Sequence, residues 1–216
     1  KFQKLKECRK EAGKYLLRTM IGILALQGNY HAHTKILVGL KIPVKEIRYP
    51  NQLRDIDGLI IPGGESTTIN DLMKRVGFHD EIKAFSLKKP ILGTCAGLIM
   101  MSSRIKNDNQ LSTLGILDIE VSRNAYGRQA DSFVGNVKVD INQQAFSIKA
   151  PFIRAPKIIS TGDSIDVIAK CNGDIVVVKS GIHYGLTFHP ELSDIAFFHD
   201  HIFTKKNEPM KENNAA

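Results

Sequence analysis

The sequence predicts an α/β protein with a doubly wound, mostly parallel sheet, flanking helices and a sharp turn that carries a cysteine. Two observations support this. Short apolar runs alternate with segments of helical periodicity along the first half of the chain, a pattern typical of right-handed βαβ units. The segment Gly93-Thr94-Cys95-Ala96-Gly97 lies between an apolar and a helical pattern, as the nucleophile turn of many hydrolases does.

The expected elements follow in chain order. The apolar run 21–26 predicts a buried parallel strand. The next segments predict a helix at 31–40, extended chain at 43–47, a strand at 57–61, helices at 66–75 and 79–87, and a strand at 90–93. From 114 to 184 the pattern is β-rich, with strands at 134–141, 166–170 and 174–179 and an Asn172-Gly173 hairpin turn.

The organisation expected from these elements is one domain, because the sequence shows no internal repeat and no linker. We place this domain at 20–205, between a basic N-terminal extension (1–19) and a polar C-terminal tail (206–216). A chain of 216 residues can bury one sizeable core. There is no apolar run of about 18 residues for a membrane span and no secretory signal pattern, so we expect a cytoplasmic protein without membrane contact.

The net charge of +8 raises the question of nucleic-acid binding. Most of it lies in residues 1–19, which carry seven Lys or Arg against two Glu. A basic binding face belongs to the fold itself, so we expect no nucleic-acid partner. The sequence leaves open whether this extension is native. The three cysteines, Cys8, Cys95 and Cys171, lack metal-ligand or disulfide spacing and are expected to be reduced thiols.

Cys95 is the candidate nucleophile. Glycines on both sides permit a tight strand-to-helix turn, which places the sulfur at a helix N-terminus, where free N–H groups favour thiolate. The N–H of Ala96 would then face the oxygen of an attacked carbonyl. The alternative is a small buried cysteine in a glycine-rich packing turn.

A second segment, Thr187-Phe188-His189-Pro190-Glu191, follows an apolar strand pattern near the end of the chain. In extended backbone His189 and Glu191 would project to the same side. Glu191 could then hold one ring nitrogen of His189 while the other faces the thiol, as in catalytic triads. Taken alone, the segment also fits a strand-end histidine beside an exposed glutamate. Together with the cysteine turn it favours the triad.

A third segment, 62–68, follows the strand expected at 57–61 and contains Gly63-Gly64. Adjacent glycines let backbone amides approach a ligand closely, so Gly64 is a candidate for a second oxyanion donor. Ser66 is expected to cap the next helix. A plain strand-to-helix turn is the alternative. A flip of the Gly63-Gly64 peptide on partner binding is a further hypothesis.

With these segments the chain resembles the class I (triad) glutamine amidotransferases. Within that class it is similar to the family of glutaminase subunits of pyridoxal 5′-phosphate synthase, the PdxT family. The resemblance runs from about 20 to 203 and depends on residues 26–28, 62–68, 93–98, 123–129, 131–133, 153–156 and 188–192. The stretches Arg-Asn-Ala-Tyr-Gly-Arg-Gln and Ile-Arg-Ala-Pro carry the likeness to the narrower family.

The resemblance implies that Cys95 attacks the side-chain amide of L-glutamine, that His189 moves the proton and that Glu191 holds His189. It implies oxyanion donors at Gly64 and Ala96. The residues that would hold the substrate are Gly64, Glu65, Ser66, Arg123, Ile153 and Arg154. It also implies transfer of ammonia to a PdxS-type (β/α)8-barrel synthase subunit in a hetero-oligomeric complex, with no metal and no organic cofactor for the glutaminase step.

Some alternatives stay open. The glutaminase subunit of imidazole glycerol phosphate synthase shares the cysteine turn and the His-Pro-Glu segment, and a thiol-sensing or binding module could use the same fold. Arg123 and Arg154 could instead make structural salt bridges. His31 and His33 are expected to be solvated helix residues, with a place at a partner interface as the alternative. The loop 105–111 has no assigned role.

Overall fold

The structure is a computed structural model, and it describes residues 19–123, 132–141 and 144–204. The first half of the chain forms β1 (Ile21–Leu24), α2 (Tyr30–Gly39), β2 (Val44–Ile47), the 3-10 helix η1 (Pro50–Asp55), β3 (Gly58–Ile61), α3 (Ser66–Val76), α4 (Phe78–Ser86), β4 (Ile91–Thr94), α5 (Ala96–Met101) and β5 (Ser102–Ile105). The second half forms β6 (Leu117–Ser122), β7 (Phe133–Ile141), β8 (Gln144–Phe152), β9 (Lys157–Thr161), β10 (Asp166–Cys171), β11 (Asp174–Ser180), β12 (His183–Leu186), the 3-10 helix η2 (Pro190–Leu192) and α6 (Phe197–Phe203).

Within the described residues, a nine-stranded sheet has the order β2-β1-β3-β4-β12-β11-β10-β7-β8. The strands from β2 to β12 pair in parallel, and those from β12 to β8 pair antiparallel. A second sheet has the order β5-β6-β9. The predicted α/β class is confirmed, but the large sheet is half parallel and half antiparallel rather than mostly parallel. The parallel pairings come from the alternating first half plus β12, and the antiparallel ones come from the β-rich second half.

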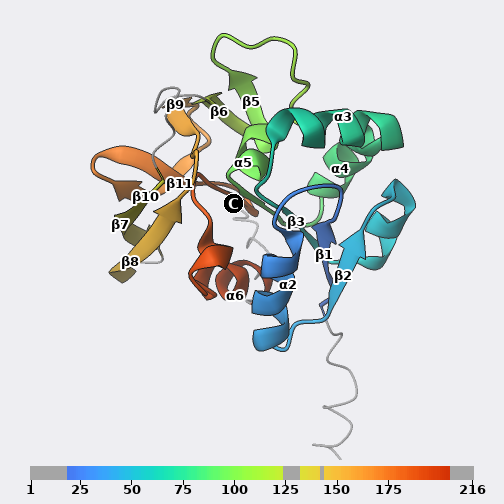
Figure 1. Ribbon diagram of the computed structural model, residues 1–216, viewed down its shortest axis with the longest axis horizontal. Coiled ribbons are helices and arrows are strands. Elements are labelled where there is room, and N and C mark those ends of the chain that lie inside the picture. The colour runs from blue at the N-terminus through green and yellow to red at the C-terminus, as the bar shows by residue number, and fades with distance from the viewer. Residues whose placement is uncertain (1–18, 124–131, 142–143, 205–216) are drawn as a thin grey trace, which may run out of the picture.

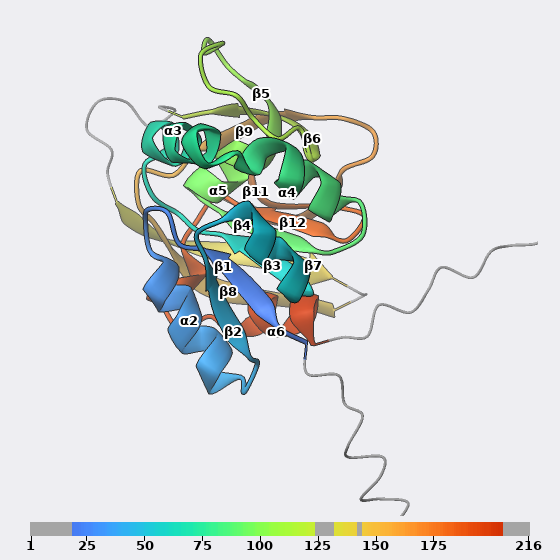
Figure 2. The same ribbon diagram turned by 90° about the vertical axis from the view of Figure 1, so that its right-hand side faces the viewer.

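Helices cover both faces of the large sheet, with α2 and α6 on one side and α3, α4 and α5 on the other (Figures 1 and 2). The central strands β1, β3 and β4 are buried along their whole length, because both of their faces are covered. Along β3, Leu59 and Ile61 belong to the core beneath α3–α5, whereas Ile60 belongs to the core beneath α2 and α6. No helix in the described ranges is both long and apolar enough to cross a bilayer.

The turn between β4 and α5 depends on contact between backbones. A Cβ atom built on Gly97 would lie 1.9 Å from the carbonyl oxygen of Ile61 in β3, and one on Gly93 would lie 2.7 Å from the carbonyl carbon of Gly97. The first neighbour cannot move without shifting β3, and the second cannot move without shifting α5. The two glycines therefore let α5 begin directly on the ends of β3 and β4, which fixes the position of Cys95.

Several of the sequence predictions concern residues outside the described ranges. The N-terminal extension, the C-terminal tail, Cys8 and the motif residues after Arg123 lie almost wholly outside the described residues. The proposed domain limits of 20 and 205 stay a prediction.

We expect Gly97→Ala to lower the free energy of unfolding by roughly 1–3 kcal/mol, the usual range for an overpacked interior, because the added methyl group meets the Ile61 carbonyl. Gly39→Ala is the matched control. A Cβ at Gly39 meets nothing within 4 Å, and alanine is the better helix former. Urea unfolding monitored by circular dichroism measures both. Equal stability of the two variants would contradict the close-approach argument.

Candidate active site

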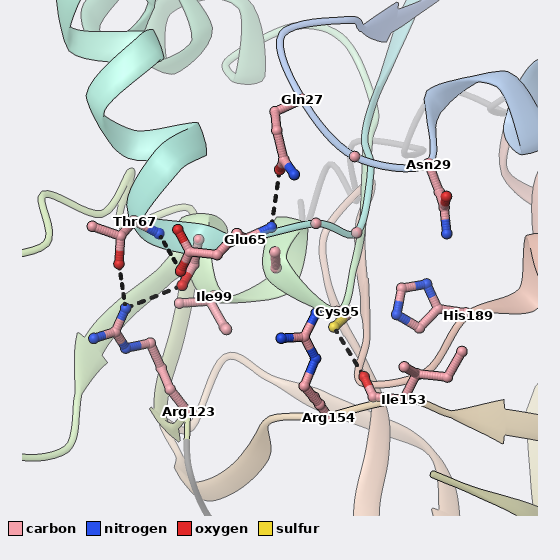
Figure 3. A pocket seen from close by; sticks show the side chains of 15 residues that line it. Gln27, Asn29, Glu65, Thr67, Cys95, Ile99, Arg123, Ile153, Arg154 and His189 are labelled. Carbon is pink, nitrogen blue, oxygen red and sulfur yellow. Dashed lines mark hydrogen bonds between the residues drawn. The ribbon is translucent and has the colours of Figure 1, made fainter. Parts of the chain in front are cut away.

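Cys95 lies between β4 and α5 in a strained backbone conformation, with φ 48° and ψ −106°. Such a conformation costs on the order of 1–3 kcal/mol in a non-glycine residue. The surrounding strands hold it, since the Cys95 N–H donates to the carbonyl oxygen of Leu186 in β12 at 2.8 Å. The Cys95 thiol lies 3.9 Å from the carbonyl oxygen of Ile153. The predicted cysteine turn is therefore present, and its thiol faces the segment after β8 (Figure 3).

His189 and Glu191 form the contact expected of a base and its orienting carboxylate. Nδ1 of His189 lies 2.7 Å from Oε1 of Glu191, and the two side chains are 7% and 0% exposed. The predicted backbone was wrong in one respect: β12 ends at Leu186, and Glu191 lies in the 3-10 helix η2. The tight turn, rather than extended chain, brings the carboxylate back to the ring.

The charge of His189 depends on these partners. Burial acts to lower its pKa, but the hydrogen bonds and charge interactions with the Cys95 sulfur and with the Glu191 carboxylate raise the pKa to about 10. The ring is therefore held as an imidazolium at neutral pH in this arrangement.

Two glycines permit the loop after β3 to lie against these groups. A Cβ on Gly63 would lie 2.3 Å from Cε1 of His189 and 3.3 Å from Cβ of Cys95, and one on Gly64 would lie 2.3 Å from Oε1 of Gln27. The Gly63 carbonyl accepts a hydrogen bond from Asn29 N–H at 3.0 Å, and Gln27 Oε1 accepts one from Glu65 N–H at 2.9 Å. The segment between β1 and α2 thus fixes the loop.

The cap of α3 is Glu65 and not the predicted Ser66. The Glu65 carboxylate accepts hydrogen bonds from the backbone N–H groups of Thr67 and Thr68 at 3.2 and 2.7 Å. Partial burial acts to raise the pKa of Glu65, but the hydrogen bonds from Thr68 and Thr67 outweigh it and lower that pKa. Glu65 is therefore an anion fixed at the pocket wall, and Ser66, the first helical residue, keeps its hydroxyl for another partner.

The partner of the Ser66 hydroxyl is Arg123. Its Nη1 donates to Ser66 Oγ and Thr67 Oγ1, each at 3.1 Å, and its Nη2 donates to Asp108 Oδ2. Both the binding and the salt-bridging interpretations of Arg123 thus have a structural basis. The loop 105–111, which had no assigned role, supplies Asp108 and so helps to hold the guanidinium.

These groups line one cavity of about 450 Å³, a volume suited to a small polar ligand. Figure 3 shows Cys95 and His189 near one another, with Arg154 beside Cys95 and Arg123 beside Thr67. Nine of the predicted site residues line it: Gly64, Glu65, Ser66, Cys95, Ala96, Arg123, Ile153, Arg154 and His189. Glu191, the tenth, lies behind His189. Arg154 has a φ of 45°, an uncommon value for a non-glycine residue.

Other residues of this cavity were not predicted from the sequence, among them Gln27, Asn29, Thr67 and Ile99. Gln27 and Asn29 follow the carboxyl end of β1, where open α/β sheets bind their ligands, so their position in the chain was an available signal.

The prediction for His33 was wrong. His33 is fully buried, with Nε2 at 3.5 Å from Glu191 Oε2 and Nδ1 at 2.8 Å from Nε2 of His199. It shares the buried face of α2 with Ile36 and Leu37, three and four residues further on, and this helical spacing was the signal for burial. His31 is exposed, as expected, with 73% of its side chain accessible.

Comparison with known proteins agrees with this geometry. A glycine-flanked cysteine at the end of β4, on this sheet topology, is the arrangement of class I glutamine amidotransferases. Residues 23–208 match the SNO glutamine amidotransferase family, and the chain belongs to that family.

Relatives and a solved structure support the assignment. The chain is 42% identical over 182 residues to the pyridoxal 5′-phosphate synthase subunit PdxT of Halalkalibacterium halodurans, covering 84% of this chain and 91% of the relative. It is 45% identical over 175 residues to the subunit of that name from Bacillus pumilus, covering 81% and 88%. A crystal structure of a glutamine amidotransferase superposes with a TM-score of 0.80 at 35% identity, covering 85% of this chain and 97% of that one.

The raised pKa of His189 predicts a stability change with pH. A histidine whose pKa is raised on folding stabilises the protein fully below the unfolded value of about 6.5 and loses that contribution as the pH rises through the folded value, which is about 10 here. We therefore expect the free energy of unfolding of the wild type to fall between pH 7 and pH 10 relative to that of His189→Asn. Urea unfolding at several pH values measures the difference, and parallel curves would contradict the raised pKa.

Proposed function

We propose that this chain hydrolyses L-glutamine to L-glutamate and ammonia and passes the ammonia to a synthase that makes pyridoxal 5′-phosphate. The observation that carries the proposal is the 2.7 Å contact between His189 and Glu191, because His189 and the strained Cys95 line the same cavity and Glu191 holds His189 from behind. A nucleophile, its base and the group that orients the base are thus provided together.

The proposed reaction has two halves. His189 already carries a proton at neutral pH, so Cys95 Sγ attacks the side-chain amide carbon of glutamine as a thiolate. His189 then donates its proton to the departing nitrogen, so that ammonia leaves and a glutamyl thioester forms. A water molecule, deprotonated by His189, then attacks the thioester carbon. Cleavage of the carbon–sulfur bond releases glutamate and leaves the Cys95 thiolate beside the protonated His189 ring.

The oxyanion formed in each half needs fixed donors. We assign this role to the backbone N–H groups of Gly64 and Ala96. Both residues line the cavity next to Cys95, and Ala96 is the first residue of α5, so its N–H has no partner within the helix.

The other end of the substrate carries an α-ammonium and an α-carboxylate. Glu65 and Arg123 supply an anion and a cation to the cavity wall, which matches these two charges. With Gly64, Ser66, Ile153 and Arg154, they form the proposed glutamine site. Glu65 is held by the first turn of α3, so its carboxylate is oriented before the substrate arrives.

The proposed partner is a PdxS-type (β/α)8-barrel subunit in a cytoplasmic hetero-oligomeric complex. The support is the PdxT name of the relatives. The chemistry also favours direct transfer, because ammonia that escapes into water at neutral pH is mostly protonated and no longer nucleophilic.

Cys95→Ala should reduce partner-dependent glutamate release from glutamine by at least about 10³-fold, as removal of a nucleophile commonly does. Cys171→Ala is the matched control, since Cys171 lies in β10, outside the cavity, and should retain activity. Release is measured with and without the synthase subunit. Activity that survives in Cys95→Ala would exclude the proposed mechanism, whereas Cys95-dependent activity indifferent to the partner would exclude only the proposed pathway.

Arg123→Lys should raise KM for glutamine about tenfold and change kcat much less. Lysine keeps the charge, but it loses the planar fork that contacts Ser66, Thr67 and Asp108. The matched control is Arg104→Lys, because Arg104 pairs with Asp118 at an exposed position. Steady-state kinetics with the complete complex measures both, and an unchanged KM in Arg123→Lys would remove Arg123 from the glutamine site.

A further inference from the structure

A group of buried polar side chains lies behind the His189–Glu191 pair. It consists of His33 from α2, Thr94 from β4 and His199 from α6, all with no exposed surface. The helices α2 and α6 lie next to one another on the same face of the sheet (Figures 1 and 2). Buried polar groups are costly unless they are hydrogen-bonded, so such a cluster calls for an explanation. The proposed reaction gives no role to any of the three residues.

The first observation concerns the second oxygen of Glu191. Oε1 contacts His189, but Oε2 is buried and has no hydrogen-bond partner of normal length among the described residues. It faces Nε2 of His33 at 3.5 Å. A buried carboxylate oxygen is stabilised by an N–H donor, and the His33 ring is placed to provide one.

The second observation concerns the proton of His33. Its Nδ1 lies 2.8 Å from Nε2 of His199, and one of these two nitrogens carries the hydrogen. If His199 donates, the proton of a neutral His33 is on Nε2 and points to Glu191. If His33 donates, the His199 proton moves to Nδ1 near the Ile195 carbonyl, and a His33 lone pair then faces the carboxylate. In the first arrangement the bare Nδ1 of His199, which has no hydrogen-bond partner of normal geometry among the described residues, faces only the neutral Ile195 carbonyl. In the second, the His33 lone pair faces a charged carboxylate, and this stronger repulsion favours the first arrangement.

Burial keeps both rings neutral, as this arrangement requires. Burial lowers the pKa of His33 well below 6.5, and the nearby His199 and His189 rings lower it further. Burial also lowers the pKa of His199 to about 4. The groups that face His33 are Glu191 from η2, His199 from α6 and Thr94 from β4.

The third observation connects His33 to the glycine loop. Thr94 Oγ1 lies 3.3 Å from His33 Nε2 and accepts a hydrogen bond from Gly63 N–H at 3.1 Å. Gly63 in turn packs against the His189 ring. The same imidazole nitrogen is therefore adjacent to the carboxylate that orients the base and to the hydroxyl that holds the loop.

We propose that His33, supported by His199, is a positioning residue whose Nε2–H fixes the Glu191 carboxylate, and through it the His189 ring, relative to Cys95. The proposal rests on the proposed function, in which Cys95 is the nucleophile and His189 its base. It extends the three catalytic side chains into a buried row that reaches α2 and α6.

The test uses three substitutions of His33 in the full chain. His33→Gln retains an N–H donor near the Nε2 position, His33→Asn is also polar but too short to reach Glu191, and His33→Leu has no donor. The measured quantity is the rate at which iodoacetamide alkylates Cys95 at pH 7.5, followed by mass spectrometry of the Cys95 peptide. This rate depends on the ionisation of the thiol and on the position of His189, and it can be measured without the partner subunit. Urea unfolding shows which variants fold, and only those variants are compared.

We expect alkylation about tenfold slower in His33→Asn and His33→Leu and close to wild type in His33→Gln. In the complete complex, kcat should follow the same order while KM for glutamine stays nearly constant. His31→Leu, two residues earlier on α2 and exposed, is the control and should alkylate at the wild-type rate. Nitrogen-15 chemical shifts of the histidines should place the His33 proton on Nε2.

Wild-type rates in folded His33→Asn and His33→Leu, or a His33 proton on Nδ1, would overturn the positioning role and leave the proposed function intact. A failure of the proposed function has a different signature. In that case wild-type Cys95 would be alkylated no faster than Cys171, and glutamine hydrolysis would not depend on Cys95.

Discussion

The parallel pairing of β3, β4 and β12 is the constraint on which the site depends. Gly93 of β4 is in register with Ile61 of β3 on one side and with Gly185 of β12 on the other. The chain leaves the three strands at the same edge of the sheet, so the glycine loop, Cys95 and His189 emerge together although they are far apart in the sequence. Hydrogen bonds between the strands then fix their relative positions, and the strained conformation of Cys95 persists because β12 holds its N–H.

The residues around Cys95 form two parts with different physical character. One part is an open, charged cavity in which Glu65 and Arg123 are held by the first turn of α3 and by Asp108. The other is a dry, polar interior behind His189, in which Glu191, His33 and His199 have almost no contact with solvent. A substrate with two charged groups suits the first part. The second suits the orientation of a base, because electrostatic interactions are stronger where water is excluded.

The corrections to the sequence predictions have local causes. Ser66 is a typical capping residue, yet Glu65 caps α3. The side chain of Glu65, which is longer than that of serine, extends to the N–H groups of Thr67 and Thr68 in the first turn. His189 and Glu191 meet through the 3-10 turn that Pro190 begins, although alternation along a strand suggested the same pair. His33 was expected at the surface because histidine in a helix is commonly solvated, but α6 covers that face of α2 and gives His33 a polar partner in His199.

The alternating elements of the parallel strands, the cysteine turn, the His-Pro-Glu segment and the family can be read from the sequence alone, because each is encoded within a few consecutive residues by apolar runs, glycines and short motifs. The sequence did not determine which distant residues complete the site. Asp108 beside Arg123, Gln27 beside Glu65, and His33 with His199 behind Glu191 are contacts between separate elements. No local pattern encodes such contacts, since they exist only after the sheet is formed and its two faces are covered by helices.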